Sequence, residues 1–264
     1  MPRSPIRLRS RTPWPTRCGT LREPDPQRIC GPNAVRALFL RRPQDAQRLF
    51  FDPERAAFAE PLARHMARTR RIFREVWPEE LNRVAGTTHH GGIVAIATPR
   101  RAVPLDEGEL PAILWQAPLL PVLDGIGNPH NLGAILRSAV FFGARAVVLG
   151  DDPRQADLSD AVFRISEGAV EHLAIYRADN LPKLLRRLEG RLLPVAALAA
   201  GGVPPSQVPR GKPIALVLGN EEEGPTSQVV AACAGSCTLP PMGPMESLNV
   251  SVAAGVLFAA LTVP

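Results

Sequence analysis

Apolar and polar positions follow two patterns along the chain, and the change between them falls near residue 118. From there on, short and nearly all-apolar runs are separated by segments with helical periodicity. In the segment 131–142, apolar residues recur at positions i, i+3, i+4 and i+7, as on one face of a helix. Continuous apolar strands separated by helices are typical of a parallel sheet covered on both faces. We therefore predict a parallel α/β unit over residues 118–264, called here the back module.

The periodicity also predicts where the elements of the back module lie. Its last segment, residues 248–264, is uncharged but shorter than the roughly 20 residues that span a bilayer, and Asn249, Ser251 and Gly255 favour a buried helix. We expect strands at 119–123, 146–149, 173–176, 192–198, 214–218 and 238–239, and helices at 131–142, 159–171, 180–189, 225–233 and from residue 246 onward.

A smaller α/β unit, residues 29–98, precedes it and is called the front module. Asn33 is expected to cap its first helix, because a side-chain oxygen there can accept from free backbone N–H groups. Residues 99–117, rich in proline and charge, are predicted to be a linker. Within the front module we expect strands at 49–51, 72–76 and 92–97, and helices from Asn33, over 54–68 and after Pro78.

Charge is distributed unevenly along the chain. Residues 1–101 hold 20 arginines against 9 acidic residues, a net charge of +11, whereas residues 102–264 have a net charge of −5. Residues 1–28 hold six prolines and seven arginines, and we expect a disordered basic tail there. Arginine favours bidentate contacts with phosphates and stacking on bases. An arginine-rich genome gives the same bias, so charge alone leaves nucleic-acid binding open.

Cysteine content and the N-terminal sequence bear on the compartment. The four cysteines are too few for a disulfide scaffold, and the Cys233–Cys237 pair lacks the second pair that a zinc site needs. The N-terminus has no apolar stretch of the kind found in signal peptides. We therefore expect a cytoplasmic protein with reduced thiols, no metal and no association with a membrane.

The loop after the first back-module strand, residues 124–131, is the first candidate for chemistry. Ligands of open parallel sheets bind at the carboxyl ends of the strands. This loop has a G-x-G spacing without the third glycine of a dinucleotide site, so it is a weak phosphate-binding signal. Asn131 stands at the helix entry and Arg137 six residues later. The simpler interpretation is a helix cap and a surface cation.

Two later loops carry further polar residues. In residues 219–225, glycines at both ends allow a ligand to approach the backbone, and Glu221 can accept hydrogen bonds. Its three consecutive glutamates also complement the dipole of a following helix, which is the alternative explanation. Residues 239–250 form a proline-rich loop in front of the last helix, with Ser247 and Asn249 expected in its first turn. Capping by Ser247 accounts for only one of these two polar residues.

Together and in this order, the three loops resemble the SpoU/TrmH family of RNA ribose 2′-O-methyltransferases, in the SPOUT superfamily. The front module resembles, more weakly, the L30e-like substrate-binding domain that often precedes this catalytic unit, through residues 31–35 and 90–95. The residues that match the catalytic motifs are Asn131, Gly133, Ala134, Ile135, Arg137, Ser138 and Ala139, then Leu218, Gly219, Glu221 and Gly224, then Pro240 with Ser247, Leu248, Asn249, Val250 and Ser251.

The resemblance implies a fold, a cofactor and an assembly. It implies a C-terminal trefoil knot, which no pattern of residues could predict because knots are nearly absent from proteins. It also implies that S-adenosylmethionine binds in the knot, held largely by backbone groups of Gly219, Leu239 and Leu248. By the same resemblance the protein is a homodimer through its knot domain, and its partner is tRNA or rRNA.

The resemblance assigns the main catalytic role to Arg137, with Asn131, Glu221, Ser247 and Asn249 around it. A guanidinium stays protonated up to a pH of about 12, so it is a poor general base. Our hypothesis is that Arg137 binds the adjacent phosphate and stabilises the developing alkoxide, and that Glu221 orients the site. Only RNA carries the 2′-hydroxyl that such a reaction needs.

Two departures from the family pattern and two other functions stay open at this point. Pro241 stands where the family commonly has methionine, and Glu222 and Glu223 add negative charge near an anionic substrate. The main alternative is a catalytically inactive RNA-binding or ribosome-assembly protein on the same fold. A nucleotide-dependent oxidoreductase lacks its glycine fingerprint and the acidic residue on the second strand.

Overall fold

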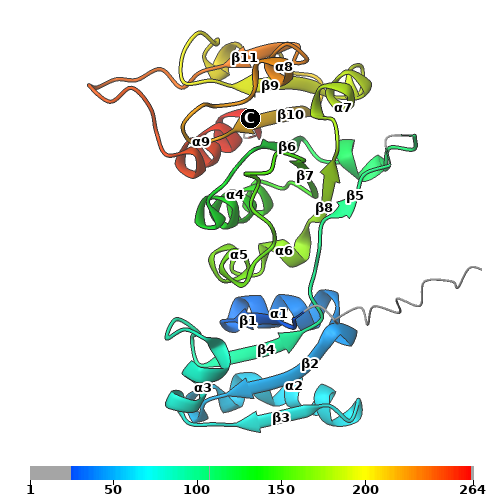
Figure 1. Ribbon diagram of the computed structural model, residues 1–264, viewed down its shortest axis with the longest axis vertical. Helices are drawn as coiled ribbons and strands as arrows, with labels where there is room; N and C mark the ends of the chain where they lie inside the picture. The colour runs from blue at the N-terminus through cyan, green and yellow to red at the C-terminus, as the bar shows by residue number, and fades with distance from the viewer. Residues whose placement is uncertain (1–24, 107, 263–264) are drawn as a thin grey trace, which may run out of the picture.

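The computed structural model describes residues 25–106 and 108–262, and they fold around two separate β-sheets (Figure 1). A four-stranded sheet with the order β1-β4-β2-β3 belongs to the front module. A seven-stranded sheet with the order β11-β9-β10-β6-β7-β8-β5 belongs to the back module. The predicted disordered tail lies, up to residue 24, outside the described residues.

The front module is a mixed sheet with helices packed against it. Strand β4 runs antiparallel to both β1 and β2, while β2 and β3 are parallel. Strand β1 was not predicted, and it contains the last residues of the expected tail. The elements are β1 (Gln27–Cys30), α1 (Pro32–Arg41), β2 (Ala46–Phe51), α2 (Ala56–Arg68), β3 (Ile72–Glu75), α3 (Pro78–Ala85) and β4 (Ile93–Ala97).

The prediction that Asn33 caps the first helix is wrong. The residue before helix α1 is Gly31, whose φ of 97° suits glycine, and Pro32 occupies the first helical position, where its missing N–H costs nothing. Asn33 lies within the first turn, and its side chain is free to bond elsewhere.

The parallel α/β fold predicted for the back module is confirmed. All strand pairs of its sheet are parallel, and β6, β7 and β10 are buried at every position. The strands are β5 (Val103–Pro104), β6 (Leu119–Asp124), β7 (Ala146–Gly150), β8 (Ala174–Ala178), β9 (Leu193–Ala197), β10 (Ile214–Gly219) and β11 (Gly235–Cys237). The helices are α4 (Pro129–Phe141), α5 (Asp160–Ser166), α6 (Ala169–His172), α7 (Leu181–Leu188), α8 (Ser227–Val230) and α9 (Val250–Thr262).

One predicted helix, over residues 159–171, is divided into α5 and α6. The chain turns through left-handed conformations at Glu167, with φ 47°, and Gly168, with φ 92°. A β-carbon on Gly168 would lie 2.9 Å from the β-carbon of Ala37 in helix α1. The break therefore lets the backbone of the back module sit directly on the front module.

The C-terminal elements also differ from their predicted bounds. The last helix starts at Val250 rather than at residue 246, so Ser247 and Asn249 lie before it and not in its first turn. The side-chain oxygen of Asn249 accepts from the N–H of Ser251, and its carbonyl accepts from the N–H of Ala253. Asn249 thus caps the helix. The strand expected at 238–239 is instead β11, and the helix expected at 225–233 is the short α8.

Part of the predicted linker belongs to the larger sheet. Strand β5 pairs in parallel with β8 through Val103 and Tyr176, and a short 3-10 helix, Ala112–Trp115, follows it. The segment between the modules is therefore anchored at both of these points.

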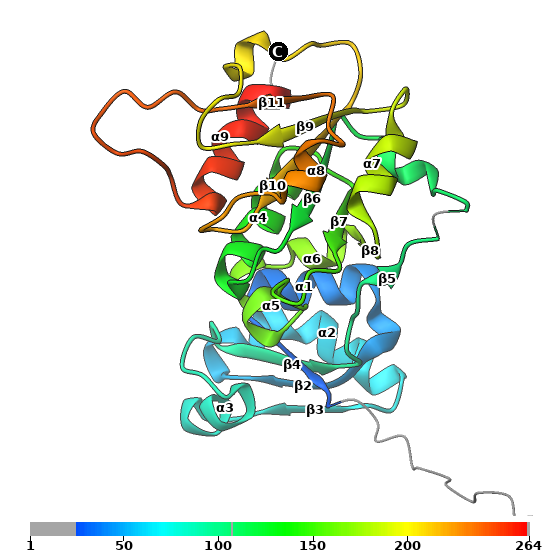
Figure 2. The same cartoon turned by 45° about the horizontal axis from the view of Figure 1, so that its top comes forward.

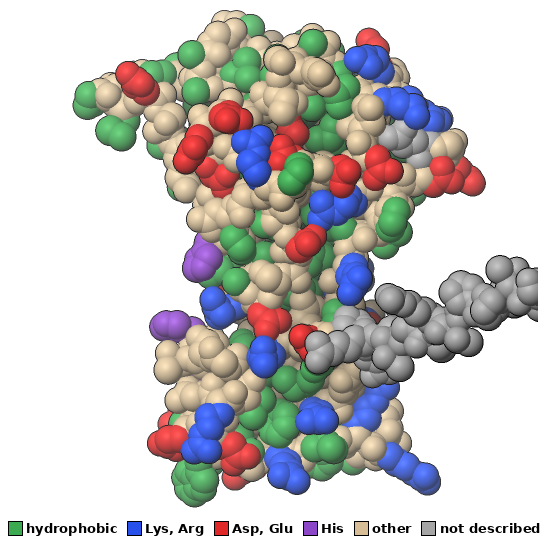
Figure 3. All heavy atoms as spheres, viewed as in Figure 1, with side chains coloured by type: hydrophobic (Ala, Val, Ile, Leu, Met, Phe, Trp, Pro, Cys, Tyr) green, Lys and Arg blue, Asp and Glu red, His purple; other side chains and the backbone are tan. Residues whose placement is uncertain are grey.

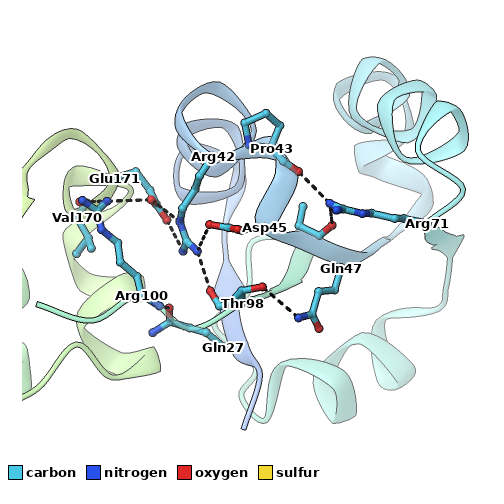
Figure 4. Close-up of polar contacts among 11 residues, drawn as sticks. Gln27, Arg42, Pro43, Asp45, Gln47, Arg71, Thr98, Arg100, Val170 and Glu171 are labelled. Atoms are coloured by element: carbon cyan, nitrogen blue, oxygen red, sulfur yellow. Dashed lines mark hydrogen bonds and ion pairs between the residues drawn. The ribbon is translucent and has the colours of Figure 1, made fainter. Parts of the chain in front are cut away.

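A buried ion cluster joins the two modules (Figure 4). Glu171 of α6 accepts from Nε and Nη2 of Arg42, both at 2.8 Å, and from Nη1 of Arg100 at 3.1 Å. Its side chain is fully buried. Burial alone would lower the pKa of Arg42, but the hydrogen bonds and charges of Glu171 and Asp45 raise it overall. Arg42 belongs to the front module and Arg100 to the segment that follows it, so Glu171 ties the back module to both.

Helix α9 packs beside α4 on the back module, and the loop before it stands out from the body (Figure 2). None of the helices in residues 25–106 and 108–262 combines the length and the hydropathy of a membrane-spanning segment. The trefoil knot and the L30e-like character of the front module stay predictions.

Candidate active site

A cavity of about 610 Å³ opens where strands β9 and β10 end. Its size is in the range of sites for small molecules and cofactors. The carboxyl ends of parallel strands are also where open α/β sheets bind their ligands. The cavity is lined by residues 197–200 around the end of β9, 218–225 around the end of β10, and 239–248 in the projecting loop, with Val250, Ala253 and Leu257 of α9.

Glu221 lines this cavity and accepts three hydrogen bonds. Its Oε1 accepts from Nδ2 of Asn131 at 2.9 Å and from the backbone N–H of Asn128 at 3.3 Å, and its Oε2 accepts from the N–H of Gly127 at 3.4 Å. Partial burial would raise the pKa of Glu221, but these bonds outweigh it and hold the pKa below its ordinary value. The carboxylate is therefore ionised at neutral pH.

Asn131 connects Glu221 to the segment before the last helix. Its Oδ1 accepts from Nδ2 of Asn249 at 3.1 Å, and its side chain is buried. The simple interpretation of Asn131 as a helix cap is wrong, because Asn128 caps α4 by accepting from the N–H of His130. The fold thus brings together Glu221 from the loop after β10, Asn131 from the first turn of α4 and Asn249 from the residue before α9.

Among the described residues, neither Arg137 nor Ser247 is hydrogen-bonded to this network. Arg137 is six residues beyond Asn131, so it projects from a different side of α4, and its Nη1 lies 3.3 Å from Oε1 of Glu167. Its side chain is 58% exposed. Ser247 is exposed and lines the cavity.

The residues expected to hold the cofactor, Gly219, Leu239 and Leu248, all line the cavity. At Gly219 the fold of the chain itself also requires a glycine. A β-carbon there would lie only 1.8 Å from the backbone nitrogen of Pro225, because the loop folds back on itself. Close approach by the chain itself, rather than by a ligand alone, requires this glycine. Leu239 is half-buried and Leu248 is 54% exposed.

Of the two additional glutamates near the site, Glu223 is paired with an arginine. Oε2 of Glu223 lies 2.8 Å from Nη1 of Arg154, which also pairs with Asp152 at 2.9 Å. The hydrogen bond from Arg154 lowers the pKa of Asp152. Figure 3 shows acidic side chains gathered over the back module, next to basic ones. Among the described residues, no three His, Cys, Asp or Glu side chains are grouped as a metal site requires.

Comparison with known families covers most of the chain. The family model described as "SpoU rRNA Methylase family" matches residues 118–259, and the one described as "RNA 2'-O ribose methyltransferase substrate binding" matches residues 28–103. The chain belongs to the SpoU rRNA methylase family. The family membership predicted from the three loops is thereby confirmed, and the oxidoreductase alternative is wrong.

Similar proteins include named SpoU methylases. The 23S rRNA (guanosine-2'-O-)-methyltransferase RlmB of Nitrosomonas europaea is 35% identical, over 87% of this chain and 88% of its own. The protein of the same name from Ralstonia nicotianae is 40% identical, over 69% of this chain and 74% of its own.

Solved structures of the family share the fold. A structure described as an RNA 2'-O ribose methyltransferase is 26% identical, with a TM-score of 0.70 over 89% of this chain and 86% of its own. The SpoU methyltransferase AviRb of Streptomyces viridochromogenes, in complex with AdoMet, has a TM-score of 0.71 at 20% identity, over 89% of this chain and 88% of its own.

The residues linked to the candidate catalytic arginine, Glu167 by direct contact and Asn33 through Glu167, could not be identified from the sequence. Glu167 pairs with Arg137, and Asn33 of the front module donates to Glu167. They lie 134 positions apart, so no local pattern relates them. The only sequence signal is the glycine of the Glu167-Gly168 pair, which interrupts an otherwise helical segment.

Proposed function

We propose that this protein transfers a methyl group from S-adenosylmethionine to a ribose 2′-hydroxyl in ribosomal RNA, with tRNA as the other candidate substrate. The observation that carries the proposal is the network of Glu221, Asn131 and Asn249, in which Glu221 lines the cavity. It belongs to a SpoU methylase chain whose relatives of 35–40% identity are named as 23S rRNA guanosine-2'-O-methyltransferases.

The cavity fits S-adenosylmethionine in size and in lining. Its volume of about 610 Å³ accommodates a ligand of that size, and its lining combines backbone groups with apolar side chains. Gly219, Leu239 and Leu248 are the residues that would hold the cofactor. When bound, S-adenosylmethionine supplies a methyl group already activated by a sulfonium. AviRb, a protein of the same fold, has been solved with AdoMet bound.

The chain's own residues would position the ribose and control charge. Glu221 stays ionised and fixes the amide of Asn131, which in turn orients Asn249. Ser247 is exposed on the cavity wall, where its hydroxyl can contact the substrate. Arg137 contacts an RNA phosphate and stabilises the alkoxide that develops as the 2′-hydroxyl loses its proton.

We also propose a division of labour and an assembly. The front module, residues 29–98, binds RNA, residues 99–117 connect it, and residues 118–264 carry out methyl transfer in a trefoil-knotted domain. Homodimer formation is supported by an exposed apolar surface on α4 and α9, where Phe141, Val252 and Val256 are 82%, 51% and 45% exposed. The free thiols of Cys30, Cys233 and Cys237 among the described residues, together with an RNA substrate, are consistent with the cytoplasm.

A methyl-transfer assay tests the main proposal. Full-length protein is incubated with methyl-labelled S-adenosylmethionine and rRNA or tRNA purified from a strain that lacks the gene. We expect label at a single ribose, which resists alkaline cleavage at that position. RNA binding without any label, together with no heat of S-adenosylmethionine binding in calorimetry, would instead establish the inactive RNA-binding alternative.

A further inference from the structure

The carboxylate of Glu167 bridges the two modules at the candidate catalytic arginine. Its Oε1 lies 3.3 Å from Nη1 of Arg137 on α4, and its Oε2 accepts from Nδ2 of Asn33 on α1 at 2.8 Å. Each oxygen therefore serves a different module. Asn33 is itself held from the other side, because its Oδ1 accepts from Nη2 of Arg36 at 3.2 Å.

The backbone at Glu167 is unusual for a residue with a side chain. Its φ of 47° lies in the left-handed region, where glycine and asparagine are preferred and a glutamate is disfavoured. Among the described residues, Arg70 is the only other non-glycine residue with a positive φ. Disfavoured backbone conformations persist where the surrounding structure enforces them and cluster at functional sites, and here the side chain contacts both modules.

The surrounding packing gives this bridge a fixed geometry. Helix α5 approaches α4 closely at Gly133, where a β-carbon would lie 2.8 Å from the β-carbon of Ile165. Gly168 sits against α1, and the buried Glu171 cluster locks the interface four residues beyond Glu167 (Figure 4). Asn33 thus has a defined position relative to Arg137.

We propose that Glu167 is a positioning residue, which aims the guanidinium of Arg137 and, through Asn33, ties that direction to the RNA-binding module. The proposal rests on the proposed function, in which Arg137 contacts an RNA phosphate. The Arg137–Glu167 pair is exposed, with 58% and 45% of the two side chains accessible, so an incoming phosphate can share the guanidinium at little cost.

Loss of the Glu167 carboxylate should lower kcat and KM together, so its two effects on kcat/KM oppose each other. Arg137 becomes free to adopt other rotamers, so fewer complexes have it in the reactive orientation, and kcat falls. A negative charge beside the phosphate path also disappears, so RNA binds more tightly and KM falls. A residue that only held the fold together would not lower both constants.

Three variants and one control test the proposal. Glu167→Gly removes the side chain and relieves the left-handed backbone, so its unfolding temperature should be no lower than that of the wild type. Glu167→Gln removes only the charge, and Asn33→Ala removes the link to the front module. The control Asp160→Asn breaks another exposed ion pair between the modules, Arg28–Asp160, which does not contact Arg137.

We expect kcat to fall by up to about fivefold in Glu167→Gly, the range that an exposed ion pair supports. Asn33→Ala should lower kcat in the same direction, and the double variant should be no worse than Glu167→Gly alone, because both act on one link. Without S-adenosylmethionine, the apparent Kd for an rRNA fragment at low salt should fall in both Glu167 variants and stay unchanged in Asp160→Asn.

Wild-type kcat and Kd in Glu167→Gly would overturn the proposal, and so would equal losses in Glu167→Gly and Asp160→Asn. Arg137→Ala separates this failure from failure of the proposed function. If Arg137→Ala is inactive while Glu167→Gly is fully active, only the positioning role is wrong. If Arg137→Ala is itself fully active, the role proposed for Arg137 fails, and the positioning role fails with it.

Discussion

Replacement of Glu171 by alanine tests whether the two modules are held together by their buried charges. The carboxylate has no exposed surface and accepts from three guanidinium nitrogens, at 2.8, 2.8 and 3.1 Å. Its removal leaves Arg42 and Arg100 positively charged at a buried interface. Removing one partner of a buried ion pair typically costs about 3–5 kcal/mol. Arg42 keeps a bond to the carbonyl of Thr98 at 2.7 Å, so we expect the lower end of this range.

Urea unfolding followed by circular dichroism measures this cost. The matched control is Asp160→Asn at the exposed interface pair, for which we expect at most about 1 kcal/mol. Because Glu171 lies between the modules, Glu171→Ala should also separate a single unfolding transition into two, and limited proteolysis should cut first near the linker. A loss of less than about 1 kcal/mol in Glu171→Ala, equal to that of the control, would refute the reasoning.

Three further predictions concern the site, the thiols and the module contact. Asn249→Ala should lose about 1 kcal/mol of stability with the helix cap and lower kcat about tenfold in the methyl-transfer assay. Burial raises the pKa of Cys30 and Cys237 to about 11. Between about pH 9 and 11 the thiols of the unfolded chain therefore lose protons that the folded chain keeps, so the Tm should fall across this interval. A constant Tm would contradict the prediction. Gly168→Ala should destabilise more than Gly190→Ala in thermal unfolding, because both have a φ near 91° but only Gly168 is crowded.

The parallel sheet was predictable because it depends on a property that each strand carries locally. Strands β6, β7 and β10 are buried on both faces, so each appears in the sequence as a continuous apolar run. Strand β1 was missed because Gln27 and Arg28 interrupt its apolar character. Its place in the sheet depends on pairing with β4, which lies about 65 residues later.

The candidate site was predictable only in part, and the reason is again the range of the interactions. Asn131, Glu221 and Asn249 were each identified from a loop, but nothing local indicates that they bond to one another in a chain. The start of the last helix was misplaced because its cap is Asn249 and not a residue near 246. The contact of Arg137 with Glu167 depends on a helix break that only the docking of Gly168 on α1 explains.

Distant contacts also change how the basic charge of residues 1–101 is interpreted. The sequence suggested that its net charge of +11 serves RNA binding, but several of its arginines have structural partners. Arg42 and Arg100 neutralise Glu171, and Arg71 donates to the carbonyls of Pro43 and Ala46 within the front module. Because Glu171 belongs to the acidic back half, part of the charge asymmetry along the chain is cancelled at the interface between the modules. Salt should therefore weaken RNA binding through the exposed arginines while leaving this buried junction largely intact, since buried pairs are screened much less than exposed charges.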